Sequence, residues 1–141
     1  MLQKKTSVIL MLLLSVLFLV SGCATISPKP GNVKEVGCAN GNIQWDVAPE
    51  AEIQSFDCAL GTHEGDPSLI YTVSIKNISD KAVRYRLTIF LDDMDKGVAY
   101  YVPIKGTPPA VKPGEVQKVT IPFMKTTVFS KKLSVTVKTL E

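Results

Sequence analysis

Apolar residues recur at every second position in several short segments of this chain. Residues 84–91 are one example, in which Tyr85, Leu87, Ile89 and Leu91 are the apolar positions. A period of two places alternate side chains on opposite faces of a strand, so each segment predicts a β-strand with one buried face. The predicted strands are residues 43–47, 53–60, 71–76, 84–91, 98–104, 119–123 and 133–137.

Turn-forming residues separate these strands. Pro113-Gly114 predicts a tight turn, because proline presets φ and glycine accepts the left-handed conformation. Residues 92–97 join two strands, and we expect Gly97 to take a positive φ. Pro103 and Pro122 lie within strand patterns, which predicts edge strands or irregular strand ends there.

The loop at residues 92–97 also predicts a strand register. Pairing Leu91 with Val98 places Ile89 opposite Tyr100 and Leu87 opposite Val102. Every pair on that face is then apolar, which makes the register self-consistent.

Seven short antiparallel strands with turns at this spacing predict an all-β sandwich. Residues 69–123 resemble the immunoglobulin-like and fibronectin-type modules common in bacterial envelope proteins. The resemblance depends on a strand ending in Asn77-Ile78-Ser79-Asp80, a strand through Ile89, and Val111-Lys112-Pro113-Gly114-Glu115 before the strand through Ile121. It implies an immunoglobulin-like β-sandwich of about seven strands. Cys38 and Cys58 are too close in sequence for the inter-sheet disulfide of an immunoglobulin domain, and Trp45 lies at the wrong spacing.

The N-terminal region has the pattern of a secretory signal peptide. Lys4 and Lys5 precede an apolar run over residues 8–20. This run is shorter than the roughly 20 residues needed to cross a bilayer as a helix. A charged start, a short apolar stretch and the small residues Ser21 and Gly22 indicate export followed by cleavage.

Val20-Ser21-Gly22-Cys23 resembles the lipobox of bacterial lipoproteins. The resemblance implies that diacylglycerol is attached to the Cys23 sulfur and that a signal peptidase cuts between Gly22 and Cys23. Acylation of the new amino group, as in many bacteria, would add a further chain, and two chains hold a protein stably on a membrane. Ala24, rather than Asp, resembles cargo of the outer membrane in diderm bacteria. The alternatives are an ordinary signal with a chance cysteine and an uncleaved helical anchor.

The chain therefore divides into three parts. Residues 1–22 are the predicted signal peptide, 23–34 a lipidated N-terminus and tether, and 35–141 the sandwich domain. Ten extended tether residues reach about 30 Å at most. Once the signal peptide is removed, basic and acidic residues nearly balance. Because no basic stripe with interleaved aromatic residues occurs, we expect no nucleic-acid partner.

Cys38 and Cys58 remain as a pair once Cys23 is set aside. Outside the reducing cytosol such a pair predicts a disulfide. It would close a loop of roughly 20 residues, worth about 3 kcal/mol. We expect it to join the two N-terminal strands. The alternative is a metal site built from Cys38, Cys58 and His63, although a CxxC pair and an obvious fourth ligand are missing.

The chain contains no recognisable catalytic motif. His63, the only histidine, lies in a polar loop and is expected to be solvated, with metal binding or a partner contact as alternatives. Asp92, Asp93 and Asp95 do not have calcium-loop spacing and read as turn carboxylates. Met94 and Met124 could suggest copper but lack a Met-His cluster, so they read as ordinary packing residues. We therefore expect neither enzymatic activity nor a cofactor.

An exposed contact face is predicted on the strands at residues 84–91 and 98–104. On the predicted register Arg86, Phe90 and Tyr101 point away from the core, and exposed aromatic residues with an arginine are typical of contact surfaces. The alternative is that the second sheet or the N-terminal strands cover this face.

These observations predict a lipid-anchored accessory protein of the cell envelope that supports or assembles a larger structure through protein–protein contacts. In a diderm cell it would face the periplasm from the outer membrane. The alternative is a periplasmic metal or small-ligand carrier that uses Cys38, Cys58 and His63.

Overall fold

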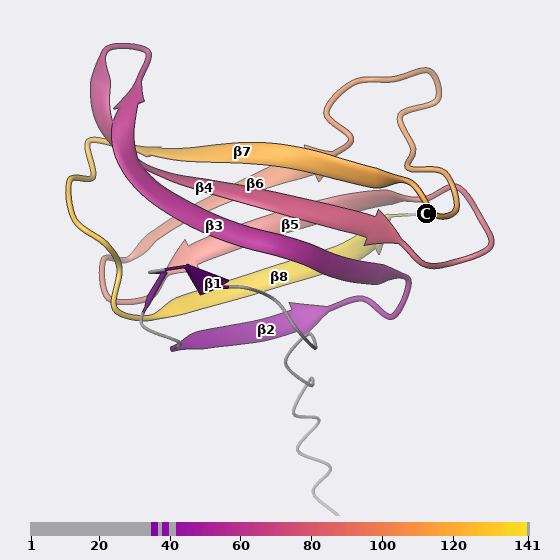
Figure 1. Cartoon of the computed structure of the whole chain (residues 1–141), viewed down its shortest axis with the longest axis horizontal. Helices are drawn as coiled ribbons and strands as arrows, with labels where there is room; N and C mark the ends of the chain where they lie inside the picture. The colour runs from indigo at the N-terminus through magenta and orange to yellow at the C-terminus, as the bar shows by residue number, and fades with distance from the viewer. Residues whose placement is uncertain (1–34, 37, 40–41, 141) are drawn as a thin grey trace, which may run out of the picture.

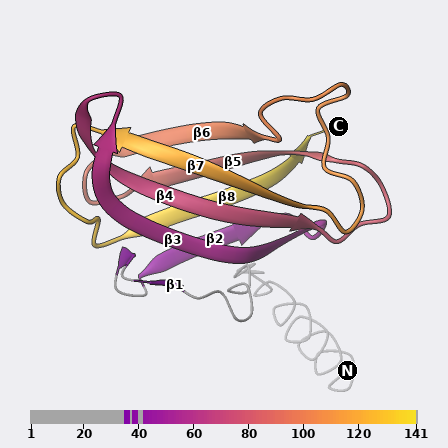
Figure 2. The same ribbon diagram turned by 45° about the horizontal axis from the view of Figure 1, so that its top comes forward.

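A computed structural model describes residues 35–36, 38–39 and 42–140. Within these residues two four-stranded sheets pack face to face (Figures 1 and 2). The first sheet has the strand order β1-β3-β4-β7 and the second has the order β2-β8-β5-β6. The strands are β1 (Glu35–Val36), β2 (Ile43–Val47), β3 (Ala51–His63), β4 (Asp66–Asn77), β5 (Arg84–Leu91), β6 (Lys96–Val102), β7 (Val116–Met124) and β8 (Leu133–Leu140).

The all-β sandwich predicted from the alternation is confirmed. All seven predicted strands occur, and β2 and β5 have the predicted bounds. The two-residue strand β1 was not predicted, because two residues are too few to show a period. Within the described part of the chain, no helix of a length and hydrophobicity able to cross a bilayer is found.

The expectation of wholly antiparallel pairing is wrong for the N-terminal strands. β1 runs parallel to β3, and β2 runs parallel to β8. β2 and β8 begin at the same end of the sandwich, where the Leu133 amide donates to the Asn42 carbonyl over 3.1 Å. No hairpin turn joins β1 to β3 or β2 to β8, so these outer strands can run in either direction relative to their neighbours.

The inner faces of the two sheets form one apolar core. Alternate residues of β4, β5, β7 and β8 are buried, as the period of two predicts. Four aromatic rings run through this core. Trp45 from the second sheet packs edge-on against Phe56 at 5.2 Å, and Phe56, Tyr71 and Phe123 continue the row across the first sheet. Burial raises the pKa of the Tyr71 hydroxyl.

The β5–β6 hairpin differs from the predicted register by two residues. Leu91 pairs with Lys96 rather than with Val98. The connection is therefore shorter than predicted, and Asp95 rather than Gly97 takes the positive φ, at 51°. A shift by two residues keeps every side chain on the same face of the sheet, so apolar pairing does not distinguish the two registers.

The other turn and edge predictions agree with the structure. Gly114 has φ 76°, and the Glu115 amide donates to the Lys112 carbonyl across the Pro113-Gly114 turn. Pro122 lies in β7, the outer strand of the first sheet, and Pro103 follows β6, the outer strand of the second.

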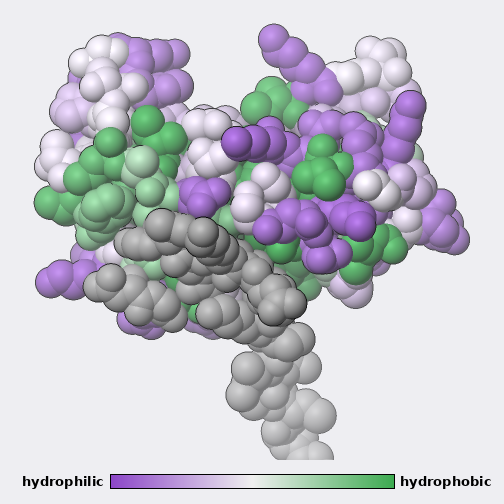
Figure 3. Space-filling model, viewed as in Figure 1, coloured by the Kyte–Doolittle hydropathy of each residue, from purple (hydrophilic) through white to green (hydrophobic). Residues whose placement is uncertain are grey.

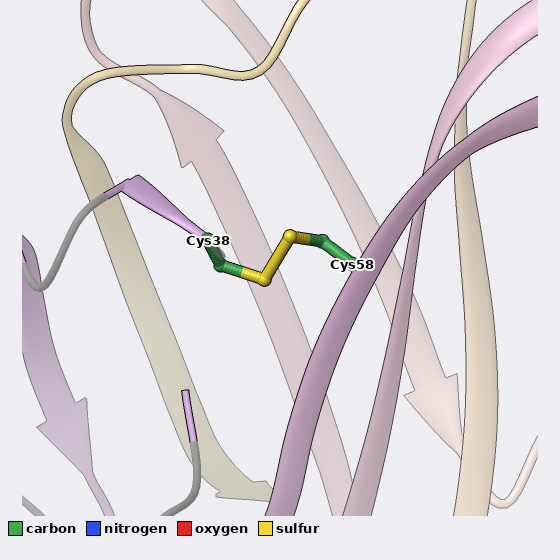
Figure 4. Close-up of a disulfide and its surroundings, with 2 residues drawn as sticks. All are labelled: Cys38 and Cys58. Carbon is green, nitrogen blue, oxygen red and sulfur yellow. A yellow bond between two sulfur atoms is a disulfide. The ribbon is translucent and has the colours of Figure 1, made fainter. Parts of the chain in front are cut away.

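The disulfide between Cys38 and Cys58 is present, with 5.8 Å between the two Cα atoms (Figure 4). It does not join the two predicted N-terminal strands directly, since β2 and β3 lie in opposite sheets. Instead it attaches the connection between β1 and β2 to the middle of β3. The bond therefore holds the segment that crosses from one sheet to the other.

Candidate functional site

The outer face of β5 and β6 carries the side chains predicted to contact a partner. The opposite sheet packs on the inner face of these strands and leaves this face open to solvent. Arg86 of β5 pairs directly with Tyr101 of β6, and both side chains are exposed. Tyr101 retains 51% of its accessible surface. The alternative in which another element covers this face is not what the described residues show.

Arg84 joins this pair, although the sequence argument did not select it. Its guanidinium carbon lies 4.5 Å from the centroid of the Tyr101 ring. A guanidinium over an aromatic face is held by the ring quadrupole, and its N–H edges stay free to donate. Arg84 and Arg86 are therefore both neighbours of one exposed tyrosine.

Phe90 lies at the other end of the same face. It is four residues beyond Arg86 on β5, a separation of about 13 Å along a strand. Phe90 pairs with Gly97, and a Cβ built on Gly97 would lie 2.7 Å from the phenylalanine ring. Phe90 thus covers the glycine of the neighbouring strand and does not form one patch with Arg86 and Tyr101.

A hollow of about 350 Å³ opens beside Tyr101, between the outer strands β6 and β7. Residues 101–105 line one side and residues 117–119 line the other. Lys105 and Lys118 both contribute to its lining, and both are exposed. The arginine–tyrosine pair and the two lysines therefore surround one end of β6.

These four cations have no carboxylate partner within the described residues. Arg84, Arg86, Lys105 and Lys118 form no ion pair there, whereas Lys138 on the same sheet pairs with Asp46 at 2.7 Å. The Arg84 Nε atom is buried and has no hydrogen-bond partner among the described residues. Unpaired cations beside an exposed aromatic ring can bind a carboxylate or another anion.

A second hollow, of about 490 Å³, opens at the other end of β6. Residues 95–98 and 122–124 line it, so it too lies between β6 and β7. Figure 3 shows hydrophobic residues gathered at the end of the sandwich that holds the β3–β4 hairpin and the β7–β8 loop. Exposed apolar side chains in these segments are Leu60, Met124, Val128 and Phe129.

The residues of the predicted carrier site are not gathered into one. Both sulfurs of Cys38 and Cys58 are in the disulfide, so neither is a thiolate ligand here. His63 lies five residues beyond Cys58 on β3, about 16 Å along the strand. Its Nε2 atom is 4.0 Å from the Glu64 Oε1 atom. In the part of the chain that the structure describes, no group of three or more His, Cys, Asp or Glu residues is arranged to hold a metal.

The acidic turn between β5 and β6 serves the neighbouring loop. Asp93 accepts hydrogen bonds from the Ser130 hydroxyl and from the Lys131 amide, and Asp92 accepts one from the Ser134 hydroxyl. The two hydrogen bonds to Asp93, chiefly the one from the Ser130 hydroxyl, lower the pKa of the Asp93 carboxyl. The carboxylates therefore fasten the β7–β8 loop to this turn.

The two methionines considered as copper ligands have different surroundings. Met94 is partly buried and packs against the core, whereas Met124 is exposed at the end of β7. Neither belongs to a cluster of metal-ligating side chains among the residues described.

Gly22 and Cys23, the predicted cleavage and lipidation residues, lie outside the described residues. Within the domain, the sequence argument placed Arg86 and Tyr101 on this outer face but did not select Arg84, Lys105 or Lys118. Lys118 reaches this region because β7, distant in sequence, lies beside β6. The uncharged run Gly97–Val102 was the available signal that β6 has an unusual edge. No protein-family model, curated protein or solved structure matches this chain.

Proposed function

We propose that this protein is a lipid-anchored binding protein of a bacterial cell envelope. In this proposal Cys23 carries the lipid, and the sandwich supports or assembles a larger envelope structure by binding a partner protein. In a diderm cell it acts at the outer membrane, on the periplasmic side. The observation that carries the anchor is the run Val20-Ser21-Gly22-Cys23 after a short apolar segment with two lysines before it.

The contact face in this proposal is the outer surface of β5 and β6. Arg86 and Tyr101 form its centre with Arg84, and Phe90 lies at its far end. Arginine and tyrosine are enriched among the residues that dominate binding energies. The charges of Arg84 and Arg86 support this choice. A partner protein that buries them can supply the anionic groups that they lack among the described residues.

The position of this face also supports the proposal. The described chain begins at β1, one outer strand of the first sheet, whereas β6 and β7 lie along the opposite side of the sandwich (Figure 2). A tether that joins the domain at β1 leaves the β6–β7 side directed away from the point of attachment.

Mass spectrometry of the N-terminal fragment tests the anchor. We expect the mature chain to begin at Cys23 and to carry a diacylglyceryl group on its sulfur, with acyl chains on the amino group in many bacteria. Cys23→Ser should abolish both cleavage and lipid attachment. An unmodified thiol at Cys23 in the mature protein would contradict the proposal.

Photocrosslinking in intact cells tests the contact face. A benzophenone side chain replaces Tyr101 in one variant, and in the control it replaces Glu52, which is exposed on β3 of the other sheet. We expect one stoichiometric partner protein to be crosslinked from position 101 and not from position 52. Equal crosslinking from both positions, or none from either, would refute the assignment of this face.

A further inference from the structure

We propose that the free edge of β6 binds an extended, acidic segment of a partner protein as an additional strand of its sheet. This inference rests on the proposed function, in which the β5–β6 face binds a partner protein. It specifies the chemistry of the partner and the way in which it docks.

The edge of β6 lacks most of the residues that usually protect an outer strand. β6 is the outer strand of its sheet and pairs only with β5 among the described residues. Natural edge strands are protected by charged residues, proline or bulges, because unpaired N–H and C=O groups are a template for another strand. β6 carries one charge, Lys96, at its first residue; the rest of the strand, Gly97–Val102, contains no charge and no proline, and Pro103 comes only after the strand has ended.

The other outer strands differ from β6 in the interior of the strand. β7 carries Lys118 and Pro122 within its length, and β2 carries Asp46. β1 has two described residues. β6 is therefore the outer strand on which a further strand pairs with the least obstruction.

Open space lies along this edge at both ends of β6. The hollow of about 350 Å³ lies at the end of β6, and the hollow of about 490 Å³ lies at its beginning. A strand that pairs with β6 places alternate side chains towards these hollows, next to the partly buried Val98 and Tyr100. The occupant therefore has apolar residues at alternate positions.

Cationic side chains lie close to this edge. The remaining side chains of an added strand lie on the outer face, beside Tyr101 and within reach of Arg84 and Arg86. Neither arginine has an ion-pair partner among the described residues, and Lys105 and Lys118 are unpaired in the same way. A carboxylate fits the planar donor edge of a guanidinium, so the outward residues of the occupant are acidic.

The unpaired backbone groups of the β6 edge argue against a lipid occupant. Phospholipid headgroups can pair with the arginines, but they offer no ladder of N–H and C=O groups to the strand edge.

The test uses the intact protein in detergent micelles and peptides of about eight residues, a usual strand length. One peptide alternates valine with glutamate, and the control alternates valine with lysine. We expect the glutamate peptide to shift the backbone amide resonances of β6 and to protect them from hydrogen exchange. The lysine peptide should do neither. A concentration of about 1 mM glutamate peptide detects even weak binding. If the amide resonances and the hydrogen exchange of β6 do not change at that concentration, the inference is overturned.

Two further measurements separate strand addition from simple charge attraction. Only every second amide of an added strand faces β6. Methylation of one alternate set of peptide amides should therefore abolish binding, whereas methylation of the other set should leave it nearly unchanged. Equal binding of both methylated peptides would refute strand addition.

Arg84→Gln should weaken binding of the glutamate peptide about tenfold, as expected for a charge-assisted hydrogen bond. Lys76→Gln is the matched control, because it removes one charge from β4 of the other sheet, away from the β6 edge. Equal effects of the two substitutions would contradict the assignment. Vesicles rich in phosphatidylglycerol that shift β6 when the glutamate peptide does not would overturn the inference in favour of a membrane.

A failure here is distinguishable from a failure of the proposed function. A partner that crosslinks from position 101, together with no binding of the glutamate peptide, would refute only the acidic strand. The absence of lipid on Cys23 would refute only the anchor.

Discussion

Asn77 is a fully buried polar side chain at the end of β4. The other inward-facing residues of that strand are mostly apolar. Its amide nitrogen donates to the carbonyls of Lys81 at 2.6 Å and Val111 at 2.8 Å. Its amide oxygen accepts a hydrogen bond from the Ser79 amide at 2.9 Å. One side chain thus links the β4–β5 turn to the segment that precedes β7.

Asn77→Asp should be strongly destabilising at neutral pH. A carboxylate can still accept from Ser79, but it cannot donate to the two carbonyls and it repels them. We expect a loss of about 2–4 kcal/mol in the free energy of unfolding, measured by urea denaturation. Ile78→Ala is the control, because Ile78 is 52% exposed and should change stability little.

The pH dependence of this variant gives a second check. The buried carboxyl has a raised pKa, since burial and the carbonyls both disfavour its charged form. The difference between wild type and Asn77→Asp should therefore grow as the pH rises above about 4, the usual value for Asp. A difference that does not change with pH would contradict this account.

Gly97 allows the Phe90 ring to lie across the β5–β6 hairpin. Gly97→Ala places a Cβ 2.7 Å from that ring, so the ring must move. We expect a loss of about 1 kcal/mol in unfolding free energy. In a Phe90→Ala background the same substitution should be neutral or stabilising, because alanine suits a strand better than glycine. Equal effects in both backgrounds, in a double-mutant cycle, would refute the contact.

At the scale of elements, the disulfide holds the crossing between β1 and β2 to β3. Cys38→Ala with Cys58→Ala should lower the unfolding free energy by about 3 kcal/mol, since the loop that the bond closes is then free in the unfolded chain. Urea denaturation of wild type with and without dithiothreitol measures the same quantity. A wild-type midpoint that does not respond to the reductant would contradict the expected contribution.

The β5–β6 turn and the β7–β8 loop are coupled through Asp93. Its pKa is lowered, chiefly by the Ser130 hydroxyl and then by the Lys131 amide, so the folded protein binds this proton less readily than the unfolded chain does. The stabilisation is therefore present above the unfolded pKa of about 3.9 and is lost as pH falls through the lowered folded value.

Asp93→Asn should consequently be less stable than wild type at pH 7, and this difference should be smaller at about pH 2. We expect a difference below about 1 kcal/mol, because the carboxylate is exposed to solvent. Thermal denaturation at both pH values measures it. A difference that grows on acidification would show that the sign is wrong.

At the scale of the whole molecule, Trp45 connects the two sheets. It is the only tryptophan, it lies on β2, and its ring packs edge-on against Phe56 of the other sheet. Its fluorescence therefore reports on sheet-to-sheet packing, whereas circular dichroism reports on the strands themselves.

Trp45→Ala should cost about 3–5 kcal/mol, the usual range for removal of a large buried aromatic side chain. In wild type the fluorescence and circular dichroism transitions in urea should coincide, as expected for one cooperative domain. Separate midpoints would mean that the sheets part before the strands melt.

Several features followed from residues close together in the chain. The bounds of β2 and β5, the turn at Pro113-Gly114 and the buried half of each strand all depend on local conformational preferences and on a period of two. Arg86 and Tyr101 were assigned to the outer face for the same reason. The Cys38–Cys58 disulfide followed from cysteine number and the predicted compartment.

Other features depend on contacts between residues far apart in the chain. Two registers of the β5–β6 hairpin bury the same face, so the pattern alone does not separate them. The parallel pairing of β2 with β8 joins strands from opposite ends of the domain's sequence. Lys118 joins Arg84, Arg86 and Lys105 at this end of β6 only because β7 lies beside it. Local sequence thus dictates which residues a strand buries, but the neighbours of that strand come from long-range packing.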